Sequence, residues 1–454
     1  MKQVLLTTAT LLTLTSCAMP ETHEIINDNK LPERFLTKDE MFAESVKGFW
    51  KLPFNDQNIK RILLLAFENN SSIKLAWRNL EKSGAILDIQ QAGRKPVLDM
   101  NMSNTVSRTK VDGEGDSRSE SNDLGLSLSW ELDLWGRIQK QVDSEKFEYE
   151  ATEQDLEFTY LLIASKAIEN YLLLSALTQN SQNFSTIVTV KKDKFELIKS
   201  LYKSGNADAN QLNVANYEYI QAEYELVQLK SDILNKKSQL AVLLGVKQDQ
   251  LDEFLPISYD KNLELTNIDL INARPDLLAA KNRFLSANSK TQAAKLERFP
   301  TLKVDLGYGF SAAKVSDLYS STLFDSLVQL KLPIFRGGQI KANINLAKSE
   351  QEIALINYID LTNTVLNEVQ ANYEIYQQQS IALNFAKDKL KLAESNYKIA
   401  QKKYNLGNFD YLELLAEKQT YLEAKNTYVN ANNVYLNSVL NVYSTVGGIN
   451  FIDS

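Results

Sequence analysis

The chain has 454 residues, of which 44% are hydrophobic, and this is enough to build a sizeable core. The mean hydropathy is -0.29 and no apolar run reaches about 18 residues, which argues against transmembrane helices. The net charge is -7 and the chain has no long block of lysine and arginine, so we expect no binding to nucleic acid.

The N-terminus has the order of a bacterial lipoprotein signal peptide. Lys2 precedes an apolar stretch over residues 4–14, and small residues lead directly to Cys17. We therefore predict a signal peptide over residues 1–16, a covalent lipid on Cys17 and a lipidated linker over residues 17–55. The alternative is an ordinary cleaved signal peptide with a chance cysteine, and both alternatives imply export.

The residues around this cysteine narrow the possible chemistry. Cys17 is the only cysteine, so no intrachain disulfide can form and the fold must be held by packing. Ala18 follows it, and by the sorting rule for lipoproteins this residue favours the outer membrane. The only histidine, His23, has no metal-binding or catalytic partner in the sequence. We expect no metal site and no cofactor other than the lipid.

Long stretches without glycine or proline are the strongest indication of architecture, because these residues interrupt helices. Two stretches of roughly 68 residues predict helices about 100 Å long, and two of roughly 39 residues predict helices about 60 Å long. The four stretches cover residues 137–204, 206–244, 339–406 and 408–446.

Each shorter helix needs a stacked partner to cover the long one beside it. A helix from Arg274 to about Arg298, with proline in its first turn, would supply about 36 Å in one half. Residues 70–91 would do the same in the other half. The expected arrangement is one long helix beside two shorter ones, twice.

An internal twofold repeat explains this pairing of lengths, because local sequences also match at a spacing near 200 residues. We assign the repeats to residues 56–255 and 256–448, followed by a C-terminal tail over residues 449–454. The best match sets Tyr202, Gly205, Asn206 and Asp208 against Tyr404, Gly407, Asn408 and Asp410.

Apolar residues at three-and-four spacing form a stripe on each of the two helices of roughly 39 residues. Such a stripe is more often part of the core than a seam between subunits, and here one stripe can serve as both. The two stripes are Tyr217, Ile220, Tyr224, Val227 and Leu234, and Tyr421, Tyr428, Tyr435, Val439 and Val442.

Four stretches between the helices alternate apolar and polar residues with a period of two. They start near Leu98, Leu124, Leu302 and Phe324. The pattern fits strands of a membrane β-barrel and equally a soluble sheet with one buried face.

Polar segments, expected to be loops, separate the paired strands and favour the barrel. Because four strands cannot close a barrel and an open edge in lipid is costly, three copies would have to share twelve strands. The two expected loops are residues 109–121 and 311–321.

Several sequence blocks resemble the TolC-type outer-membrane efflux proteins, specifically the lipoprotein branch that serves resistance-nodulation-division pumps. The resemblance spans about residues 55–448. The blocks are WELDLWGR at residues 130–137, LPIFRGG at 332–338, RPDL at 274–277, Phe299 with Pro300, YLELL at 411–415, and Gly447 with Gly448.

The resemblance implies a mixed α/β membrane channel. Its fold would be a trimeric 12-stranded outer-membrane β-barrel, with 4 strands per chain, continued by a long periplasmic α-helical barrel. The subunit would be a lipid-anchored homotrimer and no enzyme. It would conduct small toxic solutes or drugs from an inner-membrane pump of the resistance-nodulation-division type and a periplasmic adaptor protein. The alternatives are a type I secretion channel, or a coiled-coil scaffold lipoprotein without a channel.

The resemblance also assigns candidate sites. Glu413 occupies the slot of the first acidic ring that closes the tunnel in the family. Ala416 stands at the slot of the second ring, and Glu417 is the candidate to replace it. A solvated helix face is the alternative explanation for both acids. The adaptor would dock at the tips formed by Gly205, Asn206, Gly407 and Asn408.

Overall fold

The structure is a computed structural model, and it describes residue 54 and residues 57–111, 114–251 and 274–447. The chain divides into two units at residues 50 and 51, and all described residues belong to the second unit, Lys51–Ser454. The predicted signal peptide, Cys17, His23, the linker up to residue 53 and the C-terminal tail lie outside the described residues.

Four long helices form where the sequence lacks glycine and proline, so these four predictions are confirmed. α5 and α8 have 67 residues each and are therefore about 100 Å long. The two stacked segments are also confirmed, as α4 and α7, with 22 residues each. The helices are α4 (Ser71–Ala92), α5 (Arg137–Lys203), α6 (Ala209–Leu244), α7 (Pro275–Leu296), α8 (Gln339–Asn405) and α9 (Tyr411–Thr445).

A further helix, α3 (Gln57–Asn69), was missed by the sequence analysis. It buries Ile59, Leu63 and Ala66 and packs against α5 and α6. Asn70 ends it by adopting an extended conformation, and its side-chain oxygen accepts hydrogen bonds from the first backbone amides of α4. Short 3₁₀ turns at Gln248–Gln250 and Val315–Ser320 were not predicted either.

The C-terminal ends of α6 and α9 are held by the residues that directly precede α4 and α7. Asn70 Nδ2 donates a hydrogen bond of 2.6 Å to the carbonyl oxygen of Leu243 in α6. Arg274 Nη1 donates one of 2.7 Å to the carbonyl oxygen of Thr445 in α9. Gly245 follows α6 with φ of 65°, and a Cβ there would lie 2.6 Å from a backbone oxygen of Asn69. The stacking of two shorter helices thus depends on one side chain in each half.

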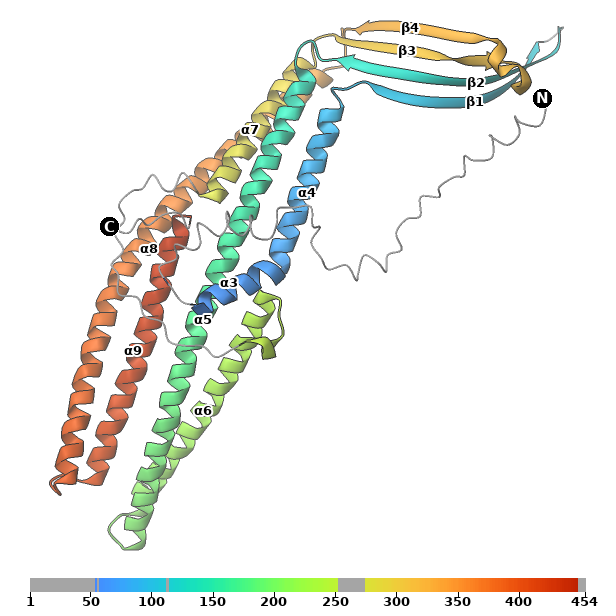
Figure 1. Cartoon of the computed structure of the whole chain (residues 1–454). Coiled ribbons are helices and arrows are strands. Elements are labelled where there is room, and N and C mark those ends of the chain that lie inside the picture. The colour runs from blue at the N-terminus through green and yellow to red at the C-terminus, as the bar shows by residue number, and fades with distance from the viewer. Residues whose placement is uncertain (1–53, 55–56, 112–113, 252–273, 448–454) are drawn as a thin grey trace. The chain divides into compact units, whose positions relative to one another are not determined.

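The long helices pack in the order α6, α5, α9, α8, with α4 and α7 also on α5 and with α7 on α8 (Figure 1). Near the tip end of α9, the contact between α5 and α9 is an apolar cluster of Ile187 and Val190 with Leu415 and Leu422. Farther along the same helix pair, Asn183 Nδ2 donates to Asn426 Oδ1 at 2.9 Å. The contact between the two halves of the helical region therefore combines apolar packing with paired amides.

The absence of an uninterrupted apolar run does not mean that every helix is polar, and α5 contains a strongly apolar stretch. Among the described residues, this helix contains an 18-residue window that passes the test of length and composition, and 56% of the window is buried inside the structure. Scattered polar residues divide the apolar runs, which concealed the window in the sequence. Its burial gives the window a packing role, because a helix that is apolar on most sides is usually covered by its neighbours.

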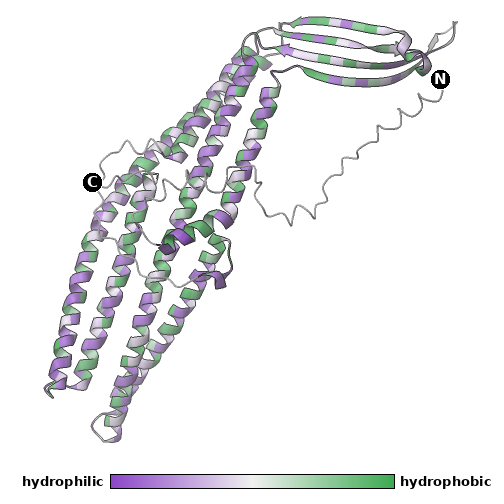
Figure 2. Ribbon diagram, in the orientation of Figure 1, coloured by the Kyte–Doolittle hydropathy of each residue, from purple (hydrophilic) through white to green (hydrophobic). Residues whose placement is uncertain are grey.

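The four strands form one antiparallel sheet in the order β1-β2-β3-β4. One row across the sheet consists of Met100, Leu126, Tyr308 and Phe324, which are partners in register. Neighbouring rows on this face are also mostly apolar, and Figure 2 shows the alternation along each strand. The predicted alternation is confirmed, and all four strands place most of their apolar residues on the same face, with Leu323 and Leu327 of β4 on the other. The strands are β1 (Val97–Val111), β2 (Glu114–Leu132), β3 (Thr301–Ala312) and β4 (Thr322–Lys331).

The predicted loop over residues 109–121 is wrong, because the β1–β2 hairpin continues through it. Ser107 pairs with Ser119 and Thr105 with Ser121, and residues 112–113 are the only ones between the two strands. Polar residues occupy both faces here, so the apolar period disappears while the backbone ladder continues. The other predicted loop also begins later than expected, since β3 extends to Ala312.

Candidate functional site

The helix tips predicted as docking sites are two turns of the same geometry. Gly205 has φ of 80° and Gly407 has φ of 75°, a conformation that side chains disfavour. The amide of Asn206 donates to the carbonyl of Leu201 at 2.8 Å. The amide of Asn408 makes the matching bond to Lys403 at 2.9 Å. These bonds satisfy carbonyls at the helix ends, so the turns are explained by capping alone.

A capping box follows each turn, and the two boxes differ in charge. In α6, Asp208 accepts from the backbone of Gln211 at 2.8 Å, and Gln211 Oε1 accepts from the backbone of Asp208 at 2.9 Å. In α9, Asp410 is the N-cap and Glu413 Oε2 accepts from its backbone at 3.2 Å. The same hydrogen bond is thus made by a neutral amide in α6 and by a carboxylate in α9.

Glu413 points away from the helix core. Leu414 and Leu415 are buried, whereas Glu413 and Ala416 are exposed and Glu417 is half-buried. Glu413 and Glu417 are four residues apart and therefore share one face of α9. The structure places the two candidate gate residues on one face of α9, where Glu413 is exposed and Glu417 is half-buried, and capping explains only the first of them.

An ion-pair cluster near the tips joins α5 to α6 and was not anticipated. Lys191 Nζ and Lys194 Nζ donate to Glu218 Oε2 at 2.9 Å and 2.8 Å. Burial raises the pKa of Glu218, but the hydrogen bonds and positive charges of the two lysines outweigh burial and leave its pKa below the usual value. The carboxylate therefore stays charged and ties the two helices of the first tip together.

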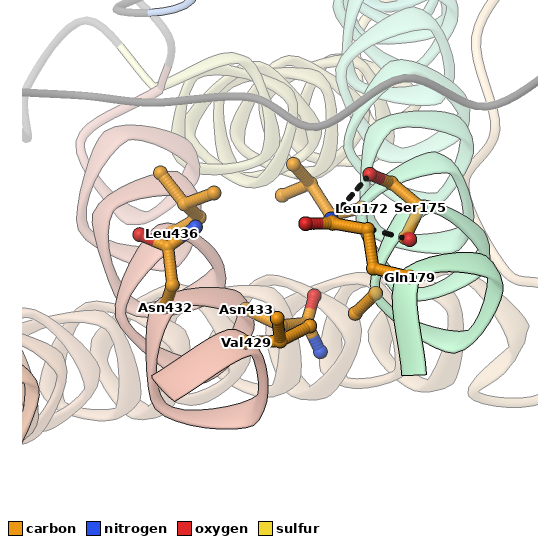
Figure 3. Close-up of a pocket in the computed structure, with 8 residues that line it drawn as sticks. Leu172, Ser175, Gln179, Val429, Asn432, Asn433 and Leu436 are labelled. Carbon is orange, nitrogen blue, oxygen red and sulfur yellow. Dashed lines mark hydrogen bonds between the residues drawn. The ribbon is translucent and has the colours of Figure 1, made fainter. Parts of the chain in front are cut away.

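A small pocket lies between α5 and α9, and Figure 3 shows its lining. Gln179, Asn432, Asn433 and Ser175 are its polar side chains, and the other lining residues are apolar. Its lining has no carboxylate, histidine or cation, and the described residues contain no group of three or more potential metal ligands. The pocket therefore offers hydrogen-bonding groups, with no titratable side chain in its lining beside the Ser175 hydroxyl.

The second face of the sheet is polar and carries several carboxylates. Asp123 accepts hydrogen bonds from Ser121 at 3.0 Å and from Ser103 at 3.3 Å, and Ser311 also donates to it. Asp99, Asp305 and Asp325 lie on the same face, because strand neighbours alternate sides. A sheet with one apolar and one acidic face suits a wall between lipid and an aqueous path for cations.

This combination defines an outer-membrane channel subunit: a four-stranded sheet with lipid-type and water-type faces, connected to helices about 100 Å long. A family model described as outer membrane efflux protein matches residues 62–246 and again residues 269–448. The chain belongs to the outer membrane efflux protein family. Its function is accordingly that of an outer-membrane channel in an efflux system.

Individual relatives agree with this assignment. The chain is 29% identical over 370 residues to the outer membrane protein OprJ of Pseudomonas aeruginosa, covering 76% of each chain. It is 20% identical over 434 residues to the probable outer membrane lipoprotein SilC of Salmonella typhimurium, covering 92% of each. The fold matches the crystal structure of the Campylobacter jejuni CmeC outer membrane channel with a TM-score of 0.81, at 23% identity and covering 88% of each chain.

Proposed function

We propose that three copies of the chain assemble into one channel, with a 12-stranded barrel in the outer membrane and a helical barrel in the periplasm. The observation that carries this proposal is the sheet. Its apolar face is continuous across four strands, yet β1 and β4 each have one edge without a partner strand among the described residues. Edges of this kind are not stable in lipid, and joining β1 of one copy to β4 of the next would remove them.

The helices support the same assembly. α6 packs on α5 and α8 packs on α9 and α7, so α6 and α8 form the two flanks of the helical region. Both flanks expose apolar side chains at heptad spacing, among them Tyr217, Tyr224, Phe385 and Leu392. A copy on each side would cover these stripes. The internal repeat over residues 56–255 and 256–448 would then give a helical barrel with nearly equivalent walls.

The finer assignments follow from this assembly and from the family. The channel would conduct small toxic solutes or drugs that an inner-membrane pump of the resistance-nodulation-division type delivers through a periplasmic adaptor. The adaptor would dock at the tips formed by Gly205 with Asn206 and Gly407 with Asn408. A lipid on Cys17 would anchor each copy in the outer membrane. The subunit would act as a conduit, without enzymatic activity or a cofactor.

Glu413 and Glu417 are proposed as the gate of this channel. The hydrogen bond that Glu413 makes to Asp410 needs only a neutral acceptor, since Gln211 makes the same bond in α6. The negative charge of Glu413 is therefore not required by the fold. Three such carboxylates around a narrow axis would attract cations and repel one another.

The test separates charge from capping by using glutamine in place of glutamate. Glu413→Gln keeps the capping hydrogen bond and removes one charge per copy. Gln211→Glu adds a charge at the matching position of α6 and serves as the control. Both variants and the wild type would be compared as purified lipidated protein in planar bilayers, with conductance and cation-to-anion selectivity as readouts.

We expect a small, cation-selective conductance for the wild type. Glu413→Gln should lower the selectivity or enlarge the conductance several-fold, while Gln211→Glu should change either quantity less. Equal behaviour of Glu413→Gln and wild type would remove Glu413 from the gate. A folded trimer without any conductance would overturn the channel itself in favour of a scaffold.

A further inference from the structure

The four junctions between strands and helices lie at the same end of the sheet, where the strands begin or end. The register fixes this, because Val97 at the start of β1 pairs with Ser129 near the end of β2. Leu132 at the end of β2 pairs with Leu302, and the start of β3 pairs with Lys331 at the end of β4. The segments that join α4, α5, α7 and α8 to the sheet are therefore neighbours (Figure 1).

Basic side chains gather in three of these segments. Arg94 and Lys95 precede β1, Arg298 precedes β3 and Arg336 precedes α8, and all four side chains are exposed. Within the described part of the chain, none of the four makes an ion pair. We call these four residues the basic girdle.

The acids close to the girdle are already engaged. Glu131 forms an ion pair of 2.6 Å with Arg137. Asp133 accepts hydrogen bonds from the first amides of α5, at 3.1 Å from Ile138 and 2.7 Å from Gln139. Glu297 accepts from an amide side chain of α8 at 3.2 Å. These three carboxylates thus cap or pair within the fold, and none of them neutralises the positive charge of the girdle.

Aromatic side chains lie at the same end of the sheet as the basic girdle. Trp130 lies on the apolar face, and its Nε1 donates to the carbonyl oxygen of Arg94 at 3.0 Å. Trp135 stacks on Phe299 with ring centroids 5.2 Å apart, and its Nε1 donates to Pro300 at 2.8 Å. Phe335, beside Arg336, is 88% exposed. Tryptophan with an apolar ring and a satisfied N–H is typical of the boundary between lipid chains and headgroups.

From this placement we propose that the basic girdle binds the headgroups of anionic phospholipids in the periplasmic leaflet of the outer membrane. The aromatic residues would set the depth, and the arginines and lysine would select negatively charged headgroups over zwitterionic ones. The inference rests on the proposed function, because it requires the sheet to span the membrane with its helices in the periplasm.

The native tryptophans provide the test. Trp130 and Trp135 lie at the junctions, so brominated lipids that collect there quench their fluorescence. The wild type would be reconstituted in vesicles of phosphatidylcholine in which a small share of brominated phosphatidylglycerol or brominated phosphatidylcholine is added. The ratio of quenching by the two lipids measures the preference for the anionic headgroup.

One variant replaces the four girdle residues with glutamine. The matched control replaces four exposed lysines, about 75 Å or more along α5 and α8 from the junctions, and so has the same change in net charge. The control residues are Lys192, Lys203, Lys389 and Lys402.

We expect the wild type and the control to prefer phosphatidylglycerol about fivefold, and the girdle variant to lose most of this preference. In 1 M salt the wild-type preference should also fall, because screening shortens the range of the attraction to about 3 Å. An equal preference in the girdle variant and the wild type, or no preference in the wild type, would overturn the proposal. Conductance of the same samples reports separately on the channel.

Discussion

At the scale of single residues, Arg274 shows how one side chain can fix the junction of two helices. Its side chain is only 7% exposed, and it binds Asp276 at 2.7 Å and 2.9 Å and the last turn of α9 at 2.7 Å. Gly447 lies against it, where an added Cβ would come within 3.1 Å of Arg274 Cγ. A buried charge in such surroundings is stable only while every partner is present.

We predict that Arg274→Met lowers the stability of the folded protein by about 3 kcal/mol, because it leaves Asp276 and a carbonyl of α9 buried without their partner. Thermal unfolding of the purified protein in detergent measures this loss. Arg283→Met is the control, since Arg283 is 44% exposed and pairs with Glu148 and Asp155 at the surface. That change should cost less than about 1 kcal/mol. Equal losses would show that burial does not matter at Arg274.

At the scale of elements, the flanking stripes on α6 and α8 are the features that the single chain leaves uncovered. Phe385, Leu392 and Ile399 of α8 and Leu406, the residue that follows it, repeat every seven residues, and each is at least half exposed. A strict seven-residue repeat is the pattern of a helix that packs along its whole length against another helix.

We predict that Leu392→Asp prevents assembly of the trimer without unfolding the protomer, because three charges would be placed in the apolar seam. Light scattering of the detergent-purified protein measures the oligomer, and circular dichroism measures helix content. Gln401→Asp is the control, since residue 401 is exposed on the side of α8 opposite Leu392. A trimer that survives Leu392→Asp would place the α8 stripe outside the interface.

Sequence reasoning succeeded for elements whose pattern is set by one physical requirement. The absence of glycine and proline predicted α5 and α8 to within two residues, and alternation predicted the strands wherever one face is apolar. It failed over residues 109–121, where polar residues on both faces erase the period. α3 was missed because it has only 13 residues and because no glycine or proline separates it from α4.

The candidate site was predictable only in part. The turn glycines predicted both tips. The spacing of Asp208 to Gln211 and of Asp410 to Glu413 is a capping-box signature that can be recognised from the sequence alone. The pairing of Lys191 and Lys194 with Glu218 could not, because the partners lie on different helices and depend on how α5 and α6 pack.

At the scale of the whole molecule, the two faces of the sheet would divide the membrane from the channel interior in the proposed trimer. Met100 lies in an apolar row and is 71% exposed in the single chain, whereas its neighbour Asn101 lies on the polar face beside Ser127. In the proposed barrel the first side chain would meet lipid and the second would meet water.

We predict opposite effects for the same substitution at these neighbours. Met100→Arg should destabilise the barrel by about 2–4 kcal/mol per copy, because a charge would face hydrocarbon, and the fraction of heat-resistant trimer after refolding into lipid measures this loss. Asn101→Arg should leave the trimer intact and reduce cation conductance, because it adds three positive charges to the interior. If both variants assemble equally well, the apolar face does not meet lipid.

The shared register of the four strands also limits how the gene can change. Every apolar row joins residues of even number, from Met100 through Leu126 and Tyr308 to Phe324. Loss or gain of one codon within a strand would turn all later side chains of that strand to the opposite face, whereas a change of two would restore the pattern. Length variation among natural variants of this protein should therefore come in pairs within the strands and be unrestricted only at the hairpin ends.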